Sequence, residues 1–298
     1  MALLSGSGSV SSPVTSRIGE LLGGRYEILQ VIGRGGQSTV YRALDRIDGD
    51  EVAIKLVHGA LGDPDATERI FREAQSMSQL LGTSAVRILH QVRTGDGALG
   101  LVMELLEGRD LETHLSELEA RNERPSLAWI EQTFAPIVST LAAAHSRGLV
   151  HRDLKAENVF LLSEARGGGV RLLDFGFVKL LRSPSITGSE MVAGSPSYIA
   201  PETWLNGAAH VDVRADVYSL GVMLFRAIAG RLPFAGETVV ELMIVVTGGP
   251  RERLSGLRTD LSPDIDAWVQ QALAIDREER FSSANGVFRA LCCCFPGR

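Results

Sequence analysis

The chain has 298 residues, of which 45% are hydrophobic and 22% are charged, and its formal net charge is −6. That length allows one large domain or one domain in two lobes, and the composition is ordinary for a globular protein. The acidic balance and the lack of a basic stripe argue against nucleic-acid binding. No apolar run in the sequence approaches the roughly 20 residues of a membrane-spanning helix, so we expect no membrane span.

The two ends of the chain carry weak signals. Residues 1–22 are rich in serine and glycine, lack the basic segment of a signal peptide, and are expected to form a disordered leader. The three cysteines are consecutive, Cys292 to Cys294, and such a cluster cannot build a disulfide framework. We therefore expect a reducing compartment, with the cytoplasm as the default location. The tail at 291–298 either has no specific role, or its cysteines are lipidated or bind a metal with an outside partner.

The first hundred residues are dominated by β-rich segments. These lie at Tyr26–Ile32, Thr39–Leu44, Glu51–Val57 and Leu99–Leu105. Between the last two, a helix is indicated by apolar residues at i, i+4, i+7 and i+11, namely Ile70, Ala74, Met77 and Leu81. The pattern predicts a small antiparallel sheet with one helix.

After Gly108 the pattern becomes helical. An apolar stripe from Leu127 to Leu141 predicts one helix, and Asp216–Ala229 and Ile265–Ala274 predict two more. The predicted fold class is therefore α+β, with a small β-rich lobe joined to a larger, mainly helical lobe. Ligands tend to bind between two such units.

A glycine-rich segment, Gly33 to Val40, lies between the first two predicted strands. Glycines let backbone N–H groups approach a phosphate closely, although such a hairpin alone is more often only a turn. On the third predicted strand, Ala53 and Lys55 point to the same face because side chains alternate. The alanine leaves room for a flat base, and the lysine can reach phosphates, with Glu73 on the following helix as its natural partner. Taken alone, Lys55 could equally be a surface lysine.

The strongest signal is the segment His151 to Asn158, which packs a carboxylate, a cation and an amide into a short loop after a helix. Asp153 can orient a hydroxyl and accept its proton. Lys155 can neutralise charge on a transferring phosphoryl group. Asn158 and Asp174, the latter in an Asp-Phe-Gly triplet, supply hard oxygen ligands of the kind that magnesium prefers. This order of residue types predicts a phosphoryl-transfer site.

These segments, in this order, resemble the signature set of the eukaryotic-like (Hanks-type) serine/threonine protein kinases in a bacterial form, over about residues 24–290. Ala200-Pro201-Glu202 resembles the Ala-Pro-Glu motif of that family, Asp216 its aspartate that braces the catalytic loop, and Arg280 the arginine that pairs with Glu202. The resemblance implies the bilobal protein kinase fold, with an N-lobe at 24–103, a hinge at 104–107 and a C-lobe at 108–290.

The resemblance implies an ATP site. Lys55 would hold the α- and β-phosphates and pair with Glu73, Met103 resembles the gatekeeper, and Asp110 resembles the acidic residue near the ribose. The residues implied to form the site are Ile32, Gly33, Gly35, Val40, Ala53, Lys55, Glu73, Met103, Glu104, Leu106 and Asp110. Ser38 replaces the third glycine of the loop. Because the first two glycines come closest to phosphate, we expect nucleotide binding to survive.

The resemblance also implies how phosphate would be transferred. Asp153 would be the catalytic aspartate, and Lys155 would contact the γ-phosphate. Asn158 and Asp174 would bind Mg²⁺, or Mn²⁺ in its place. Three residues resemble members of the family's internal hydrophobic spine, namely Met77, His151 and Phe175.

Substrate and regulation follow from the same resemblance. Lys155 after Asp153, with Gly194–Tyr198, resembles the serine/threonine branch, so the predicted partners are proteins bearing Ser or Thr. Glu157 and Asp110 would lie near the peptide groove and imply a mild preference for basic residues, or they are equally solvated surface.

Arg152 resembles the arginine that binds a phosphate on the activation segment. The candidate sites are Ser185, Thr187 and Ser189, of which Thr187 is favoured, and self-association would serve autophosphorylation. The alternative is that these are merely loop hydroxyls.

Two other interpretations stay open. A pseudokinase scaffold would share the fold, but it has no chemical need for the full set Lys55, Glu73, Asp153, Asn158 and Asp174. A small-molecule phosphotransferase would share the lobes and aspartates but lack the Ala-Pro-Glu segment. Many bacterial kinases of this kind carry a membrane helix and a sensor domain after the kinase, so the chain is expected to be either a soluble kinase or a fragment of a longer protein.

Overall fold

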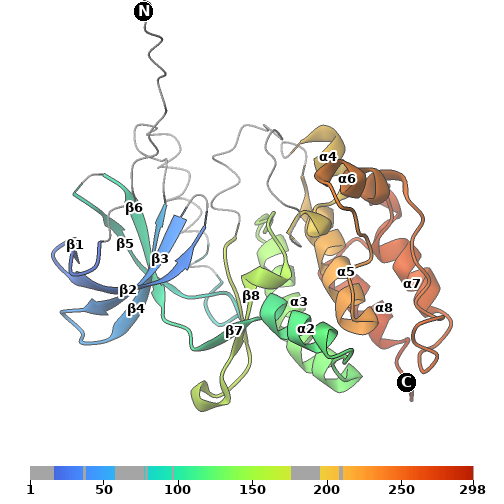
Figure 1. Ribbon diagram of the computed structural model, residues 1–298, viewed down its shortest axis with the longest axis horizontal. Coiled ribbons are helices and arrows are strands. Elements are labelled where there is room, and N and C mark those ends of the chain that lie inside the picture. The colour runs from blue at the N-terminus through green and yellow to red at the C-terminus, as the bar shows by residue number, and fades with distance from the viewer. Residues whose placement is uncertain are drawn as a thin grey trace, which may run out of the picture.

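The computed structural model describes residues 17–35, 38–57, 77, 80–95, 97–175, 195–207 and 211–297. Glu73, Ser185, Thr187 and Ser189 lie outside these ranges, as does most of the helix predicted around residues 70–81. Figure 1 shows a lobe of β-strands joined to a larger lobe of helices. The predicted two-lobed α+β architecture is confirmed.

Six antiparallel strands form the sheet of the smaller lobe, in the spatial order β1-β2-β3-β4-β6-β5. The strands are β1 (Leu21–Leu22), β2 (Tyr26–Arg34), β3 (Ser38–Asp45), β4 (Glu51–Val57), β5 (Ile88–Arg93) and β6 (Leu99–Glu104). The four predicted strands are β2, β3, β4 and β6. The edge strand β5 was not predicted, because it lacks an alternating burial pattern. Strand β1 lies within residues 1–22, which were expected to be disordered, and that expectation is wrong for its last residues because Leu22 is buried and β1 pairs with β2.

Strand β4 is buried on both faces apart from its first residue. Val52, Ile54 and Leu56 pack into a small cluster on one face of the sheet. Val57 belongs instead to the main cluster, which extends through the helical lobe. Because side chains alternate along a strand, Ala53 and Lys55 share the face of Val57 and turn toward the larger lobe.

Seven helices of the described residues build the larger lobe (Figure 1). They are α2 (Leu111–Ala120), α3 (Leu127–His145), α4 (Pro201–Asn206), α5 (Val213–Ala229), α6 (Val239–Gly248), α7 (Ile265–Ala272) and α8 (Ala284–Cys292). A second sheet, β7 (Gly108–Asp110), β8 (Val159–Leu162) and β9 (Val170–Leu172), lies where the two lobes meet. Every residue of α5 from Ala215 onward is buried, so this helix forms the centre of the lobe.

The predicted helices correspond to α3, α5 and α7, whereas α2, α4, α6 and α8 were not predicted. Helix α8 changes the interpretation of the cysteine tail. It ends at Cys292, and both Cys292 and Cys294 are buried in the main cluster while Cys293 is exposed. The first half of the predicted tail is therefore part of the hydrophobic core. Within the described residues, no helix is both long and apolar enough to span a bilayer.

Candidate active site

The glycine-rich segment forms the hairpin between β2 and β3. Gly33 pairs with Val40, and the N–H of Gly35 donates to the Ser38 carbonyl at 2.8 Å. Neither glycine has a positive φ, and a Cβ added at either would meet no atom closer than 3.6 Å. Internal packing therefore does not require glycine here, which fits a backbone that a ligand approaches closely. Ile32 beside them is 46% exposed.

Lys55 is buried, with 4% of its surface exposed, so the interpretation as a surface lysine is wrong. Its Nζ lies 2.5 Å from Oδ1 of Asp174. A buried ammonium needs a counter-charge, and Asp174 supplies one from the larger lobe. Ala53, also buried, pairs across the ladder with Met103 of β6. The lysine, the small residue and the end of β6 thus meet on one face of the sheet.

The linker after β6 is fixed to both lobes. The carboxylate of Glu104 accepts from the backbone N–H of Arg87 at 2.8 Å and from Nε of Arg171 at 3.1 Å. Leu106 is partly buried against the main cluster. Gly108 follows with φ 147°, and a Cβ there would lie 2.0 Å from the Leu161 carbonyl oxygen. Only glycine fits at this position, which sequence reasoning noted merely as a boundary.

Asp110 begins helix α2 as its N-cap. Its two carboxylate oxygens accept from the backbone N–H of Thr113 at 2.7 Å and from the Thr113 hydroxyl at 3.0 Å. An N-cap carboxylate also benefits from the positive end of the helix dipole. The side chain is thus held in one orientation at the end of the linker.

The loop between α3 and β8 gathers the predicted transfer residues around one carboxylate. The Asn158 amide Nδ2 donates to the Asp153 carbonyl at 2.7 Å and to Asp153 Oδ2 at 3.1 Å. The Lys155 ammonium lies 3.7 Å from the same Oδ2. Asn158 is buried, while Asp153 is partly exposed. The Asp153 carboxylate is thus flanked by an amide and a cation, and 30% of the Asp153 side chain is exposed.

A buried aspartate holds the start of this loop. Asp216 of α5, 1% exposed, accepts from the backbone N–H groups of His151 at 2.7 Å and of Arg152 at 2.9 Å. Its Oδ2 also lies 2.8 Å from Nε2 of His145. Arg152 has φ 63°, a left-handed conformation that costs about 1–2 kcal/mol for an L-residue. The prediction that Asp216 braces the catalytic loop is confirmed, and its hydrogen bonds offset the backbone strain at Arg152.

His151 connects the loop to the segment of Asp174. Its Nε2 lies 2.8 Å from the carbonyl oxygen of Leu173, and the backbone N–H of Asp153 donates to its Nδ1 at 3.3 Å. The carbonyl can only accept, so the ring carries its proton on Nε2. Burial lowers the pKa of His151, which keeps the ring neutral. The ring also contacts Phe175, with centroids 4.5 Å apart.

Comparison with known proteins identifies the chain. A model of the protein kinase domain family matches residues 26–290. The chain is 35% identical over 277 residues to PksC of Streptomyces coelicolor, covering 90% of this chain and 48% of PksC. It is 35% identical over 266 residues to PknL of Mycobacterium tuberculosis, covering 89% of this chain and 64% of PknL. Both relatives are named serine/threonine-protein kinases. The chain belongs to the Hanks-type protein kinases.

The likeness extends to solved structures. The crystal structure of the Mycobacterium tuberculosis PknI kinase domain superposes with a TM-score of 0.68 at 24% identity, covering 92% of this chain and 98% of that domain. At this identity the likeness shows the fold. The kinase chain spans about half to two thirds of the length of the two curated relatives above.

The fit of a divalent cation to this kinase can be judged from its donor atoms. The Asn158 amide nitrogen is occupied by Asp153, so its carbonyl oxygen is the atom left for a cation, and Asp174 adds a carboxylate. Among the described residues, no group of three or more His, Cys, Asp or Glu could hold a metal. Two protein oxygens, completed by phosphate oxygens and water, form the kind of set that Mg²⁺ accepts.

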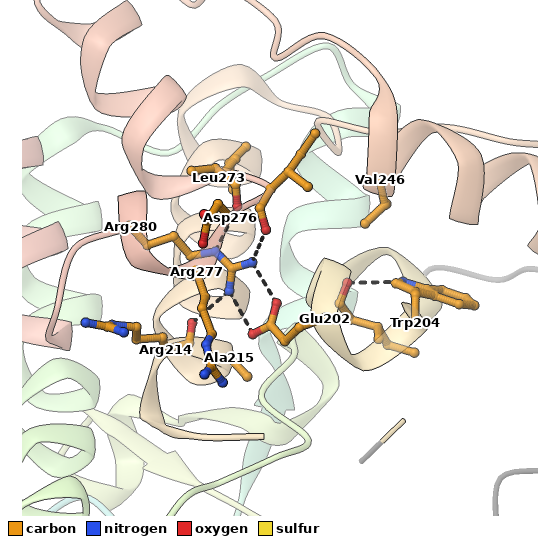
Figure 2. A network of polar contacts seen from close by, with 12 residues as sticks. Glu202, Trp204, Arg214, Ala215, Val246, Leu273, Asp276, Arg277 and Arg280 are labelled. Atoms are coloured by element: carbon orange, nitrogen blue, oxygen red, sulfur yellow. Dashed lines mark hydrogen bonds and ion pairs between the residues drawn. The ribbon is translucent and has the colours of Figure 1, made fainter. Parts of the chain in front are cut away.

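The kinase also contains the predicted pair of Glu202 and Arg280, shown in Figure 2. Nη1 and Nη2 of Arg280 bind the two carboxylate oxygens of Glu202 at 2.9 and 2.7 Å. The guanidinium also donates hydrogen bonds to the carbonyl oxygens of Ala274, Ile275 and Arg214. This bidentate pair ties α4 to the segment between α7 and α8 and thereby fixes the end of the Ala-Pro-Glu segment.

Proposed function

We propose that the protein is an ATP-dependent kinase that transfers the γ-phosphoryl group of ATP to serine or threonine hydroxyls of proteins. The observation that carries the proposal is the convergence of Lys55 and Asp174 with the Asp153–Asn158 loop at the junction of the lobes. The relatives PksC and PknL are both named serine/threonine-protein kinases, which supports the same activity. A protein that acted only as a scaffold would have no chemical need for the buried Lys55 ammonium beside the partly exposed Asp174 carboxylate.

The nucleotide would lie between the glycine hairpin and the linker. Gly33 and Gly35 would bring backbone N–H groups to the phosphates, and Lys55 would hold the α- and β-phosphates. The adenine would lie against Ala53, Val40 and Ile32, and bind the backbone of Glu104–Leu106 beside Met103. Asp110 would face the ribose. Glu73, outside the described residues, is proposed as a second partner of Lys55 in the active state.

Transfer would proceed by direct attack. The substrate hydroxyl oxygen forms a bond to the γ-phosphorus as the bond from that phosphorus to the bridging oxygen of ADP breaks. Asp153 orients the hydroxyl and accepts its proton. Lys155 stabilises the negative charge on the phosphoryl oxygens. Asn158 and Asp174 would hold Mg²⁺, or Mn²⁺ in its place, and the bound cation would supply further charge neutralisation.

The test is transfer of labelled γ-phosphate from ATP–Mg²⁺ to a generic protein substrate. Wild-type protein should label serine or threonine, and Lys55→Met should lower kcat/KM by about ten- to hundredfold, because a charged hydrogen-bond donor to phosphate is lost. If wild-type protein binds ATP but transfers no phosphate, the pseudokinase interpretation replaces this proposal. If it labels no protein but phosphorylates a small molecule such as an aminoglycoside in a parallel assay, the small-molecule phosphotransferase interpretation replaces this proposal.

We also propose autophosphorylation on the activation segment, with Thr187 as the main site. Because phosphorylation adds nearly two negative charges, Arg152 is the group that would bind the product. Intact-mass spectra should show one or more added phosphoryl groups after incubation with ATP–Mg²⁺. Thr187→Ala should reduce the addition, and Asp153→Asn should slow it by about 10²–10⁴-fold. An unchanged mass of an active wild-type protein contradicts this prediction.

Two finer proposals concern the setting of the reaction. Autophosphorylation between two copies would require transient self-association, which a rate that rises with the square of protein concentration would demonstrate. We further propose that the domain works in the cytoplasm, because none of its three cysteines forms a disulfide and a reducing compartment keeps thiols reduced. Labelling of the cysteines by a membrane-permeant but not by an impermeant thiol reagent in intact cells would test it.

A further inference from the structure

Arg226 is a buried arginine of α5 that has no role in the mechanism above. It is 3% exposed and makes a bidentate pair with Glu119, in which Nε and Nη2 lie 2.7 and 2.9 Å from the two carboxylate oxygens. Its Nη1 lies 2.5 Å from Oε2 of Glu112. Both carboxylates belong to α2, so one guanidinium attaches that helix to the centre of the lobe.

The same guanidinium also holds the end of the Gly-Ser-Pro-Ser-Tyr stretch. Nη1 of Arg226 donates to the hydroxyl of Tyr198 at 3.0 Å. At its other end, the Tyr198 carbonyl accepts from the hydroxyl of Ser219, also on α5, at 2.7 Å. Burial raises the pKa of Tyr198, so its ring stays neutral. Tyr198 is therefore fixed to α5 at both its backbone and its ring.

Helix α2 packs against the turn of the catalytic loop that contains Glu157. Glu157, in the 3₁₀ turn Ala156–Asn158, interacts electrostatically with Asp153, Lys155 and Glu112, and also with Tyr198. Its Oε2 is buried and has no hydrogen-bond partner within the described part of the chain. Arg226 thus forms ion pairs with Glu112 and Glu119 but not with the nearby Glu157.

We propose that Arg226 is a positioning residue for the protein substrate. It holds α2 and Tyr198 in one arrangement beside the catalytic loop, and it occupies Glu112 and Glu119, so that Glu157 is the carboxylate left to face the substrate. This inference rests on the proposed function. It differs from a general stabilising role because the arginine contacts α2 and Tyr198, while the Lys55–Asp174 pair of the nucleotide site receives no contact from it.

The consequence of losing Arg226 follows from the charges. Glu112 and Glu119 would be left partly buried without a cation, and they would repel each other and Glu157. Helix α2 and the Tyr198 ring would lose their common attachment. The substrate side of the loop would then be poorly ordered, whereas the groups proposed to bind ATP would keep their contacts. Substrate binding should therefore weaken more than ATP binding.

The experiment compares steady-state constants for Arg226→Gln, Arg226→Lys and Tyr198→Phe with those of the wild type, using one protein substrate. The Gln variant should raise the KM for the protein substrate about tenfold, with the KM for ATP changed less than about twofold. The Lys variant should recover part of the loss, because it keeps the charge but not the bidentate geometry. Tyr198→Phe, which removes a single hydroxyl, should raise the same KM severalfold.

The matched control is Arg251→Gln. Arg251 is equally an internal arginine of this lobe, 8% exposed, but it binds the carbonyl oxygens of Val246, Gly249 and Leu273. Its loss should lower the melting temperature without a change in the KM for the protein substrate. If Arg226→Gln does not fold, Tyr198→Phe decides the question. An unchanged substrate KM in Tyr198→Phe, or an equal change in both KM values in any folded Arg226 variant, overturns the inference. Wild-type protein that transfers no phosphate overturns the proposed function instead.

Discussion

Asp153→Asn should lower kcat for phosphate transfer by about 10²–10⁴-fold, the usual contribution of a positioned general base. The asparagine keeps the size of the side chain and can still accept from Nδ2 of Asn158, which now donates to Asp153 Oδ2 at 3.1 Å. What disappears is the negative charge that we propose orients the substrate hydroxyl and takes its proton. Initial rates at saturating ATP and protein substrate measure the loss, and calorimetric titration with ATP measures binding.

ATP affinity should stay within about threefold of the wild-type value, because the proposed site has Asp153 contact the reacting hydroxyl rather than the nucleotide. Asp50→Asn is a suitable control, since it makes the same chemical change at an exposed turn position before β4. This control should retain full activity. A kcat for Asp153→Asn equal to that of the control would show that another group accepts the proton, and the proposed site would have to be redrawn.

How far the sequence predicts this fold depends on how each element is buried. Strand β3 alternates strictly between partly buried and buried residues, so the period of two is visible in its sequence. Helix α5 is long, rich in apolar residues and buried on almost every side, and it was equally visible in the sequence. Helix α2 buries only Leu111 and Leu115, and α4 has six residues, so neither gives a stripe that separates it from a loop. Such elements form because the core around them is already in place.

Prediction of the site from the sequence is likewise limited for pairs of residues that lie far apart along the chain. Residues close together in sequence, such as Asp153 and Asn158, were predicted to act together, and they are in contact. The pairing of Lys55 with Asp174 was not predicted, because the spacing of two distant residues carries no signal about their contact. The Arg226 cluster was missed for a related reason. In the sequence, Glu112 and Glu119 look like solvated charges of a helix face, and only the fold brings a buried guanidinium to them.

The largest stability effect should come from the pair of Glu202 and Arg280. The Arg280 side chain is fully buried and that of Glu202 is 12% exposed, so neither charge has water to replace its partner. Arg280→Met should lower the free energy of unfolding by about 3–5 kcal/mol, because it leaves a buried carboxylate without a cation. Glu202→Gln should cost less than this, since the amide oxygen still accepts one hydrogen bond and the guanidinium keeps its carbonyl contacts (Figure 2). Urea unfolding monitored by circular dichroism gives both values.

Glu278→Gln provides the matched control for this prediction. Glu278 pairs with Arg214 at 2.6 Å but is 60% exposed, and a surface pair contributes about 0–1 kcal/mol. The double variant Glu202→Gln with Arg280→Met closes a thermodynamic cycle with the two single changes. Its cost should fall below the sum of theirs, because the second change removes the charge that the first left unpaired. Simple additivity, or an Arg280→Met cost as small as that of Glu278→Gln, would mean that α4 is held by packing rather than by this ion pair.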